Sequence, residues 1–174
     1  MTSFNPLKIY LFNDCLVRFC TETYSADKVT HNNRFAHLTS YSVNKKNQDA
    51  KTNPLQDLKQ LRDTYERNGI EFEPVFAQIK DLVIKTLLSV DQHIAPILGE
   101  HANARNACFE MFSFDIMLDE KMKAWVIKTS SDPTDGNVYN VLQKRINDKK
   151  LCDAYTLVGL QPYDKTKAET SEQA

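Results

Sequence analysis

Residues 108–133 read CFEMFSFDIMLDEKMKAWVIKTSSDP and contain two β-rich runs on either side of a short polar break. Aromatic and β-branched residues such as Phe114, Ile116 and Val126 favour strands, and the break Asp119-Glu120-Lys121-Met122 suits a turn. Both faces of the runs are largely apolar, which is typical of a covered, central sheet. The stretch therefore predicts a β-hairpin at the core of the domain.

Asp115 is the unusual residue of this hairpin, because a carboxylate among apolar neighbours is costly to bury without a compensating partner. If the hairpin turns at Glu120-Lys121, Asp115 lies opposite Val126, and Lys128 is its diagonal neighbour on the same face. Two interpretations stay open: Asp115 binds a metal ion, or it forms a cross-strand ion pair with Lys128. Composition alone favours the ion pair.

The rest of the chain is expected to mix short strands with helices. Apolar residues at helical spacing from Val75 to Ile94 predict one long core helix over 72–98. The other predicted elements are a hairpin over 7–20 that turns at Asn13-Asp14-Cys15, a strand over 35–43, a helix from the Asn53-Pro54 cap to Asn68-Gly69, and a helix over 138–149. The polar end DKTKAETSEQA is expected to be disordered.

Composition indicates a soluble globular protein. The chain has 174 residues, of which 41% are hydrophobic, enough for one domain with its own core. Its formal net charge of −1 gives no overall basic field for nucleic acid or anionic membranes. The four cysteines lack paired metal-ligand spacing, and no run predicts a signal peptide or a membrane helix. We therefore expect a cytosolic protein that binds neither nucleic acid nor membranes.

Basic residues at two places are candidates for binding anions. Arg18 lies between Val17 and Phe19 in an apolar run, and arginine is seldom buried unpaired. It is therefore expected to meet a carboxylate, either of the protein or of a ligand. The doublet Lys45-Lys46 either faces an acidic peptide or is simply solvated.

His37, Thr39 and Tyr41 would share one face of the predicted strand over 35–43 and line a site there. A lone histidine on a strand is more often packed or exposed than a ligand. No Ser-His-Asp or Cys-His arrangement accompanies it, so the residues do not predict nucleophilic catalysis.

Three stretches together resemble the tubulin–tyrosine-ligase-like family: KIYLFNDCLVRFCTETY at 8–24, FAHLTSYSVNKKN at 35–47, and the hairpin at 108–133. The HLT-x-YSVNK form in the second stretch is similar to the polyglutamylating members. The resemblance implies an α+β, partial ATP-grasp fold, a mostly antiparallel sheet packed with helices. It would cover residues 4–160 as the C-terminal part of the catalytic domain, followed by a polar tail at 161–174.

The resemblance also implies an activity. Family members use ATP and Mg²⁺ to phosphorylate a carboxylate, and the amine of an amino acid then attacks the acyl phosphate to form an amide bond. The implied partners are the acidic tails of tubulin or microtubules. The implied location is the cytoplasm, with association to the cytoskeleton, a cilium or a flagellum.

Several residues match positions with known roles in the family. Asp115 matches an aspartate that binds magnesium, whereas the other two metal ligands, a glutamate and an asparagine, stand here as Lys128 and Ser130. A unit charge about 4 Å from a divalent ion is worth roughly 8 kcal/mol at an effective dielectric near 20, and Lys128 turns that attraction into repulsion. The resemblance therefore predicts that metal binding fails.

At the positions that face the substrate in the family, the sequence keeps the family's residue types better than at the metal-binding positions. Arg18 matches the arginine that binds the carboxylate of the incoming substrate, Lys45 and Lys46 match a basic loop on the tubulin-facing side, and Thr39 belongs to the HLT motif. The family's adenine-binding region has no counterpart in the sequence. We expect a catalytically impaired relative of glutamate ligases. The alternatives are an active polyglutamylase whose N-terminal part lies outside this sequence, with Lys128 contacting phosphates directly, and a non-catalytic scaffold.

Overall fold

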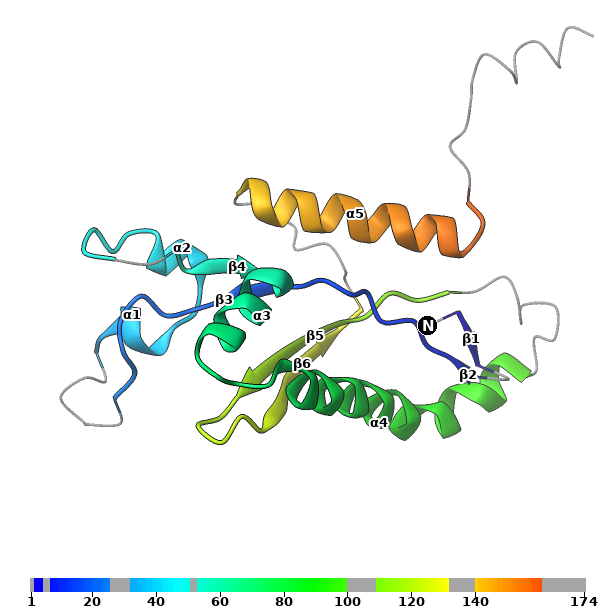
Figure 1. The fold of residues 1–174 in the computed structure, drawn as a ribbon. Coiled ribbons are helices and arrows are strands. Elements are labelled where there is room, and N and C mark those ends of the chain that lie inside the picture. The colour runs from blue at the N-terminus through cyan, green and yellow to red at the C-terminus, as the bar shows by residue number, and fades with distance from the viewer. Residues whose placement is uncertain are drawn as a thin grey trace, which may run out of the picture.

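The computed structural model describes residues 2–4, 7–25, 32–50, 53–99, 109–131 and 140–160. Within these ranges the chain forms three antiparallel, two-stranded sheets and five helices, so the predicted α+β class is confirmed (Figure 1). The elements in chain order are β1 (Ser3–Phe4), β2 (Leu7–Lys8), β3 (Leu16–Arg18), α1 (Arg34–His37), α2 (Tyr41–Asn44), β4 (Leu55–Asp57), α3 (Leu58–Arg67), α4 (Phe72–Gly99), β5 (Ser113–Leu118), β6 (Ala124–Ser130) and α5 (Val141–Leu157). β1 pairs with β2, β3 with β4, and β5 with β6.

The β5–β6 hairpin forms where the sequence predicts it, and its turn is organised by the carboxylate of Asp119. One oxygen of this carboxylate accepts hydrogen bonds from the backbone N–H groups of Lys121 and Lys123, at 2.9 and 3.0 Å. The other oxygen accepts one from the indole N–H of Trp125 at 3.0 Å. A short acidic side chain can satisfy turn N–H groups in this way, which explains why the polar break closes a tight connection.

The register of the hairpin differs from the predicted one. Asp115 pairs with Lys128 and Ile116 pairs with Val126, so Ile127 is an extra residue in β6. This β-bulge places Lys128 directly opposite Asp115, where uninterrupted pairing beyond Ile116 and Val126 would place Ile127. The prediction of Val126 opposite Asp115 was wrong because it centred the turn between Glu120 and Lys121, whereas Leu118 pairs with Ala124, and because a bulge has no clear signature in this run of residues.

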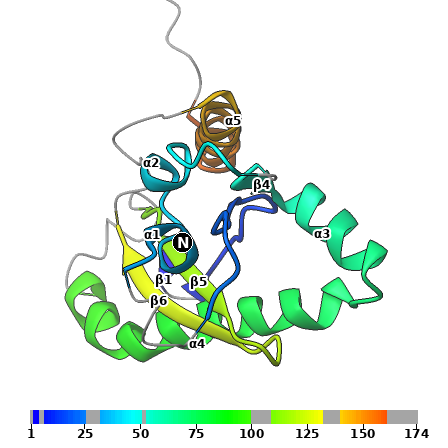
Figure 2. The same ribbon diagram turned by 90° about the vertical axis from the view of Figure 1, so that its left-hand side faces the viewer.

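One face of the hairpin packs on α4, which runs alongside it in Figure 2. Ala124 is buried there, and its backbone N–H donates to the side-chain oxygen of Gln78 in α4 at 3.3 Å. On the other face Met117, Trp125 and Ile127 are about half exposed or more. The prediction of a sheet covered on both faces is therefore wrong for the described part of the chain, because its elements leave these apolar side chains open to solvent.

The long helix is confirmed, since α4 spans Phe72–Gly99. Val75, Val83 and Leu87 recur at helical spacing, and all three are buried. Hydrophobic periodicity of this length identifies a helix because a strand would alternate every second residue. The buried stripe of α4 supports the hairpin that carries Asp115.

The predicted start of α3 at the Asn53-Pro54 pair was wrong. The helix begins at Leu58, where Asp57 accepts a hydrogen bond from the backbone N–H of Gln60 and the Gln60 side chain accepts one from Asp57. This is a capping box, which satisfies two otherwise unpaired N–H groups at once. The residues before it form β4 and pair with β3.

The predicted hairpin over residues 7–20 was also wrong, because its two halves pair with different partners. β2 pairs with β1, whereas β3 pairs with β4, with Arg18 opposite Leu55. Asp14 does not close a turn between them. Its carboxylate accepts hydrogen bonds from the backbone N–H groups of Leu58 and Cys15, at 3.1 and 2.8 Å, and so ties this segment to the start of α3.

The C-terminal helix is confirmed but is longer than predicted. α5 begins after Asn140, whose side chain caps it, and continues to Leu157 instead of ending at residue 149. Ion pairs one turn apart, Lys144 with Asp148 within the predicted range and Lys149 with Asp153 across its end, give modest support to the helical backbone. Positions 138–139 and the polar end of the chain lie outside the described residues.

Candidate functional site

β3 and β5 bring Arg18 and Asp115 together. The guanidinium Nη2 of Arg18 donates to Oδ1 of Asp115 at 3.2 Å, and the two side chains are 42% and 52% exposed. The expectation that Arg18 meets a carboxylate is confirmed, and the protein itself supplies that carboxylate. The expectation that Asp115 is buried was wrong, because the face of the hairpin that carries it is open to solvent.

Lys128 is the second cation at this site. It lies directly opposite Asp115 in the hairpin and is exposed, yet within the described residues the ion pair of Asp115 is made by Arg18 and not by Lys128. Ser130 lies opposite Ser113 farther along the same strands. Two cations therefore flank one carboxylate, and the three side chains together carry a net charge of +1.

Asn44 fixes the segment that holds the remaining candidates. Its side chain is 1% exposed, and its amide oxygen accepts hydrogen bonds from the backbone N–H and the hydroxyl of Thr21, at 2.9 and 2.8 Å. Its amide nitrogen donates to the backbone carbonyls of Leu38 and Ser40, at 2.5 and 3.0 Å. The two bonds from Thr21 join residues 38–44 to a point just beyond β3 and Arg18, and the two bonds to Leu38 and Ser40 hold that segment together.

The predicted strand over 35–43 was wrong, since these residues form α1, α2 and the link between them. Asn33 caps α1 by accepting from the backbone N–H of Phe35, and Asn44 holds the carbonyls that follow the helix. His37 and Tyr41 lie in different helices, with the partly buried Thr39 between them, so the three do not share a strand face. The polar residues that cap these helices were the available sequence signal for them. The alternation of residue types over 35–43 favoured a strand instead.

The lysine doublet is divided between two environments. Lys45 lies over the ring of Tyr41, with Nζ 5.8 Å from the ring centroid, which is within cation–π range. Lys46 lines a pocket of about 290 Å³ together with Arg34. Lys46 therefore lines this pocket, and Lys45 does not.

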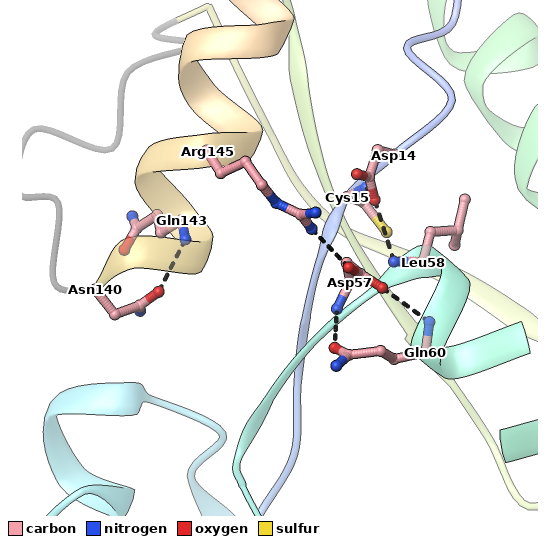
Figure 3. Close-up of polar contacts among 8 residues, drawn as sticks. All are labelled: Asp14, Cys15, Asp57, Leu58, Gln60, Asn140, Gln143 and Arg145. Carbon is pink, nitrogen blue, oxygen red and sulfur yellow. Dashed lines mark hydrogen bonds and ion pairs between the residues drawn. The ribbon is translucent and has the colours of Figure 1, made fainter. Parts of the chain in front are cut away.

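A second polar cluster, which the sequence analysis did not identify, surrounds Asp57 (Figure 3). Oδ2 of Asp57 meets Nη2 of Arg145 at 2.6 Å, so the cap of α3 is also the anchor of α5. Burial raises the pKa of Asp57, but the backbone N–H of Gln60 and the Arg145 guanidinium outweigh burial and hold that pKa below its ordinary value. The spacing Asp-x-x-Gln was the sequence signal for the cap. Nothing in the local sequence indicated that the distant Arg145 would pair with Asp57.

Comparison with known proteins identifies the family. The family model for the tubulin-tyrosine ligase family matches residues 1–153. This chain belongs to the tubulin-tyrosine ligase family. It is 39% identical over 142 residues to tubulin monoglutamylase TTLL4 of Mus musculus, which covers 77% of this chain and 12% of that relative. It is 32% identical over 181 residues to tubulin polyglutamylase TTLL6 of Mus musculus, covering 99% of this chain and 22% of the relative.

A third relative, tubulin polyglutamylase TTLL5 of Homo sapiens, is 30% identical over 168 residues, covering 91% of this chain and 13% of the relative. The chain thus spans between 12% and 22% of the length of these three family members. Among the described residues, no helix combines the length and apolar character needed to cross a membrane.

The magnesium ion implied by the family does not fit the residues at Asp115. Magnesium prefers several oxygen ligands in octahedral geometry, usually with carboxylates among them. Here Arg18 already holds the one carboxylate at 3.2 Å, and Lys128 lies directly across the hairpin from it. In the described part of the chain no three His, Cys, Asp or Glu side chains gather closely enough to hold a metal ion.

The thiol of Cys15 is expected to react slowly. Burial raises its pKa to about 11, and the carboxylates of Asp14 and Asp57 add to the shift (Figure 3). Relative to the ordinary value of 9.0, the thiolate fraction near neutral pH falls roughly 100-fold. A more basic thiolate is also more nucleophilic, which recovers roughly a factor of ten, so the net expectation is about tenfold slower reaction with a disulfide reagent.

A variant that keeps Cys15 as its sole cysteine would isolate this rate. Its reaction with dithiodipyridine at mildly alkaline pH is followed by absorbance, first folded and then in urea, where the carboxylates no longer surround the thiol. Equal rates in the two states would contradict the raised pKa of the Cys15 thiol in the folded chain.

Proposed function

We propose that this chain is a member of the tubulin-tyrosine ligase family that retains binding of acidic tubulin tails but has lost magnesium-dependent ligation. The observation that carries the proposal is the Arg18–Asp115 ion pair with Lys128 opposite it. A magnesium ion would have to displace a guanidinium and then lie beside an ammonium group. At an effective dielectric near 20, that repulsion is worth several kcal/mol at contact distances.

The remaining chemistry of the site favours anions. Arg18 uses one of its guanidinium donors on Asp115, and a guanidinium has five N–H groups in a fixed fork. Its other N–H groups, together with the ammonium of Lys128, can donate hydrogen bonds to the carboxylate of a ligand. The relatives are named as tubulin glutamylases, and the tail that this class of enzyme modifies is acidic. A site with net positive charge therefore suits the tail even where the metal chemistry is lost.

The proposal includes the wider family context. The chain would be the C-terminal part of an ATP-grasp domain over residues 4–160, and ATP together with Mg²⁺ would be cofactors of the family but not of this site. The cytoplasm, in association with microtubules, is the proposed location. The family match over residues 1–153 supports this context.

A magnesium titration followed by thermal unfolding tests the loss of metal binding. For the wild-type chain we expect no change in Tm with added MgCl₂. For the double variant Lys128→Glu with Ser130→Asn, a site with Kd of about 1 mM would gain about 1.4 kcal/mol at about 10 mM Mg²⁺. For a chain of this size that corresponds to a rise of roughly 3–6 °C in Tm.

Lys121→Glu is the matched control, because it makes the same charge change in the turn, away from Asp115. It should show no response to Mg²⁺. A magnesium-dependent rise in the Tm of the wild-type chain, or incorporation of glutamate into tubulin by it, would overturn the proposal. A double variant without any response would remove Lys128 and Ser130 as the cause of the loss.

A further inference from the structure

A second candidate site lies over α1 and α2, apart from the Arg18–Asp115 pair. It is the pocket of about 290 Å³ noted above, and its lining residues are Asn32, Asn33, Arg34, Phe35, Val43 and Lys46. This volume lies at the lower limit of the range for pockets that hold whole ligands of drug size. The pocket is therefore of a size suited to a side chain of a partner.

The charge of the pocket comes from Arg34 and Lys46. Both residues are exposed, and no carboxylate within the described part of the chain forms an ion pair with either of them. The nearby carboxylate of Glu22 accepts hydrogen bonds from the side-chain amides of Asn33 and Asn47, at 2.5 and 3.3 Å. The pocket therefore presents two cations to an incoming anion.

Its apolar lining restricts the kind of anion. Phe35 and Val43 are partly buried and supply the hydrophobic wall of the pocket. An ion carried on a short aliphatic stem, such as the side chain of glutamate, can place its methylene groups on this wall and its carboxylate at the cations. A compact, strongly hydrated anion such as free phosphate gains nothing from the wall.

We propose that the pocket of Arg34 and Lys46 binds the side-chain carboxylate of a glutamate in an acidic peptide. This inference rests on the proposed function, which supplies such a peptide in the form of a tubulin tail. It also divides the lysine doublet by role: Lys46 binds the peptide, whereas Lys45, held over the ring of Tyr41, does not.

Fluorescence anisotropy with a labelled peptide of alternating glutamate and glycine tests the inference on the full chain. Removing one charged contact of an exposed pocket costs about 1 kcal/mol, which is a factor of about five in Kd. We expect Arg34→Gln and Lys46→Gln each to weaken binding by roughly this factor. Lys45→Gln removes the same charge one residue away and is expected to change Kd by less than about twofold. A peptide with glutamine in place of glutamate should not bind.

Each contrary result identifies what fails. Equal weakening by Lys45→Gln and Lys46→Gln would mean that a diffuse field, and not the pocket, attracts the peptide. Binding of the glutamine peptide, or equal competition by an oligonucleotide of the same charge, would overturn the choice of a glutamate side chain. If the wild-type chain binds the acidic peptide and the pocket variants bind it equally well, the inference fails while tail binding stands. If the wild-type chain does not bind the peptide, the proposed function fails as well.

Discussion

Asn44→Ala is expected to lower the free energy of unfolding by about 3 kcal/mol, the largest effect of any substitution proposed for this chain. The side chain is 1% exposed and makes four hydrogen bonds, two as acceptor from Thr21 and two as donor to the carbonyls of Leu38 and Ser40. Alanine removes the partner of the Thr21 N–H and of the Leu38 carbonyl, whereas the Thr21 hydroxyl still accepts from Asn47 and the Ser40 carbonyl still accepts from backbone N–H groups. Urea unfolding followed by circular dichroism measures the loss, and Tm should fall by roughly 6–12 °C.

Gln48→Ala is the matched control for this substitution. Gln48 also lies in the segment after α2, but it is exposed, so its truncation should change stability by less than about 0.5 kcal/mol. A loss below about 1 kcal/mol in Asn44→Ala would contradict the view that the Asn44 amide holds this segment.

Asn44→Asp separates the two halves of the network. The variant keeps the oxygen that accepts from Thr21, but it places a second oxygen against the carbonyls of Leu38 and Ser40. Burial and these carbonyls raise the pKa of the new carboxyl above its unfolded value, so the folded state favours the protonated form. The destabilisation should therefore grow as pH rises from acid to neutral, and a pH-independent loss would contradict this geometry.

The sequence predicts the elements that depend on local pattern. The stripe from Val75 to Leu87 specifies α4 because a helical period over so many residues has no competing interpretation. The β5–β6 hairpin is equally clear, since Asp119 provides the turn between two β-rich runs. The expectation that Arg18 requires a carboxylate also holds, because it rests on the cost of an unpaired charge and not on a particular fold.

The errors of the sequence-based prediction occur where a residue or strand interacts with a partner that is distant in sequence. β3 is adjacent in sequence to residues that suit a turn, yet it pairs with β4, about forty residues later. The bulge at Ile127 decides whether Asp115 faces an isoleucine or a lysine, and one residue of shift changes the chemistry of the site. Side chains such as Asn44 and Asp57 carry hydrogen bonds whose partners cannot be inferred from local pattern alone.

Asp57→Ala is expected to destabilise the chain by about 2 kcal/mol, because one carboxylate both caps α3 and anchors α5. It accepts from the backbone N–H of Gln60 at 2.8 Å and pairs with Arg145 at 2.6 Å. Loss of a good cap costs about 1 kcal/mol, and the ion pair to the largely exposed Arg145 contributes up to about 1 kcal/mol. Urea unfolding at neutral pH measures the sum.

Asp57→Asn separates the cap from the ion pair, since asparagine keeps the oxygen that accepts from Gln60 and loses only the charge. We expect it to cost less than about 1 kcal/mol, and Arg145→Gln to cost a similar amount. In the double variant Asp57→Asn with Arg145→Gln the two losses should not add, because both remove the same pair. Full additivity would mean that the contact seen between α3 and α5 contributes no coupling energy.

The pH dependence of the same variants gives an independent measure of the pair. The pKa of Asp57 is lowered in the folded state from an ordinary value of 3.8, so the native carboxyl binds fewer protons than the unfolded one below that pH. The contribution of the Asp57 carboxylate to the free energy of unfolding is therefore fully present above the unfolded-state pKa. It is lost as pH falls through the folded-state pKa. The stability difference between wild type and Asp57→Asn should shrink on acidification below about pH 4 and stay constant above about pH 5. A difference that instead grows on acidification would mean that the folded state raises this pKa, contrary to the environment formed by Gln60 and Arg145.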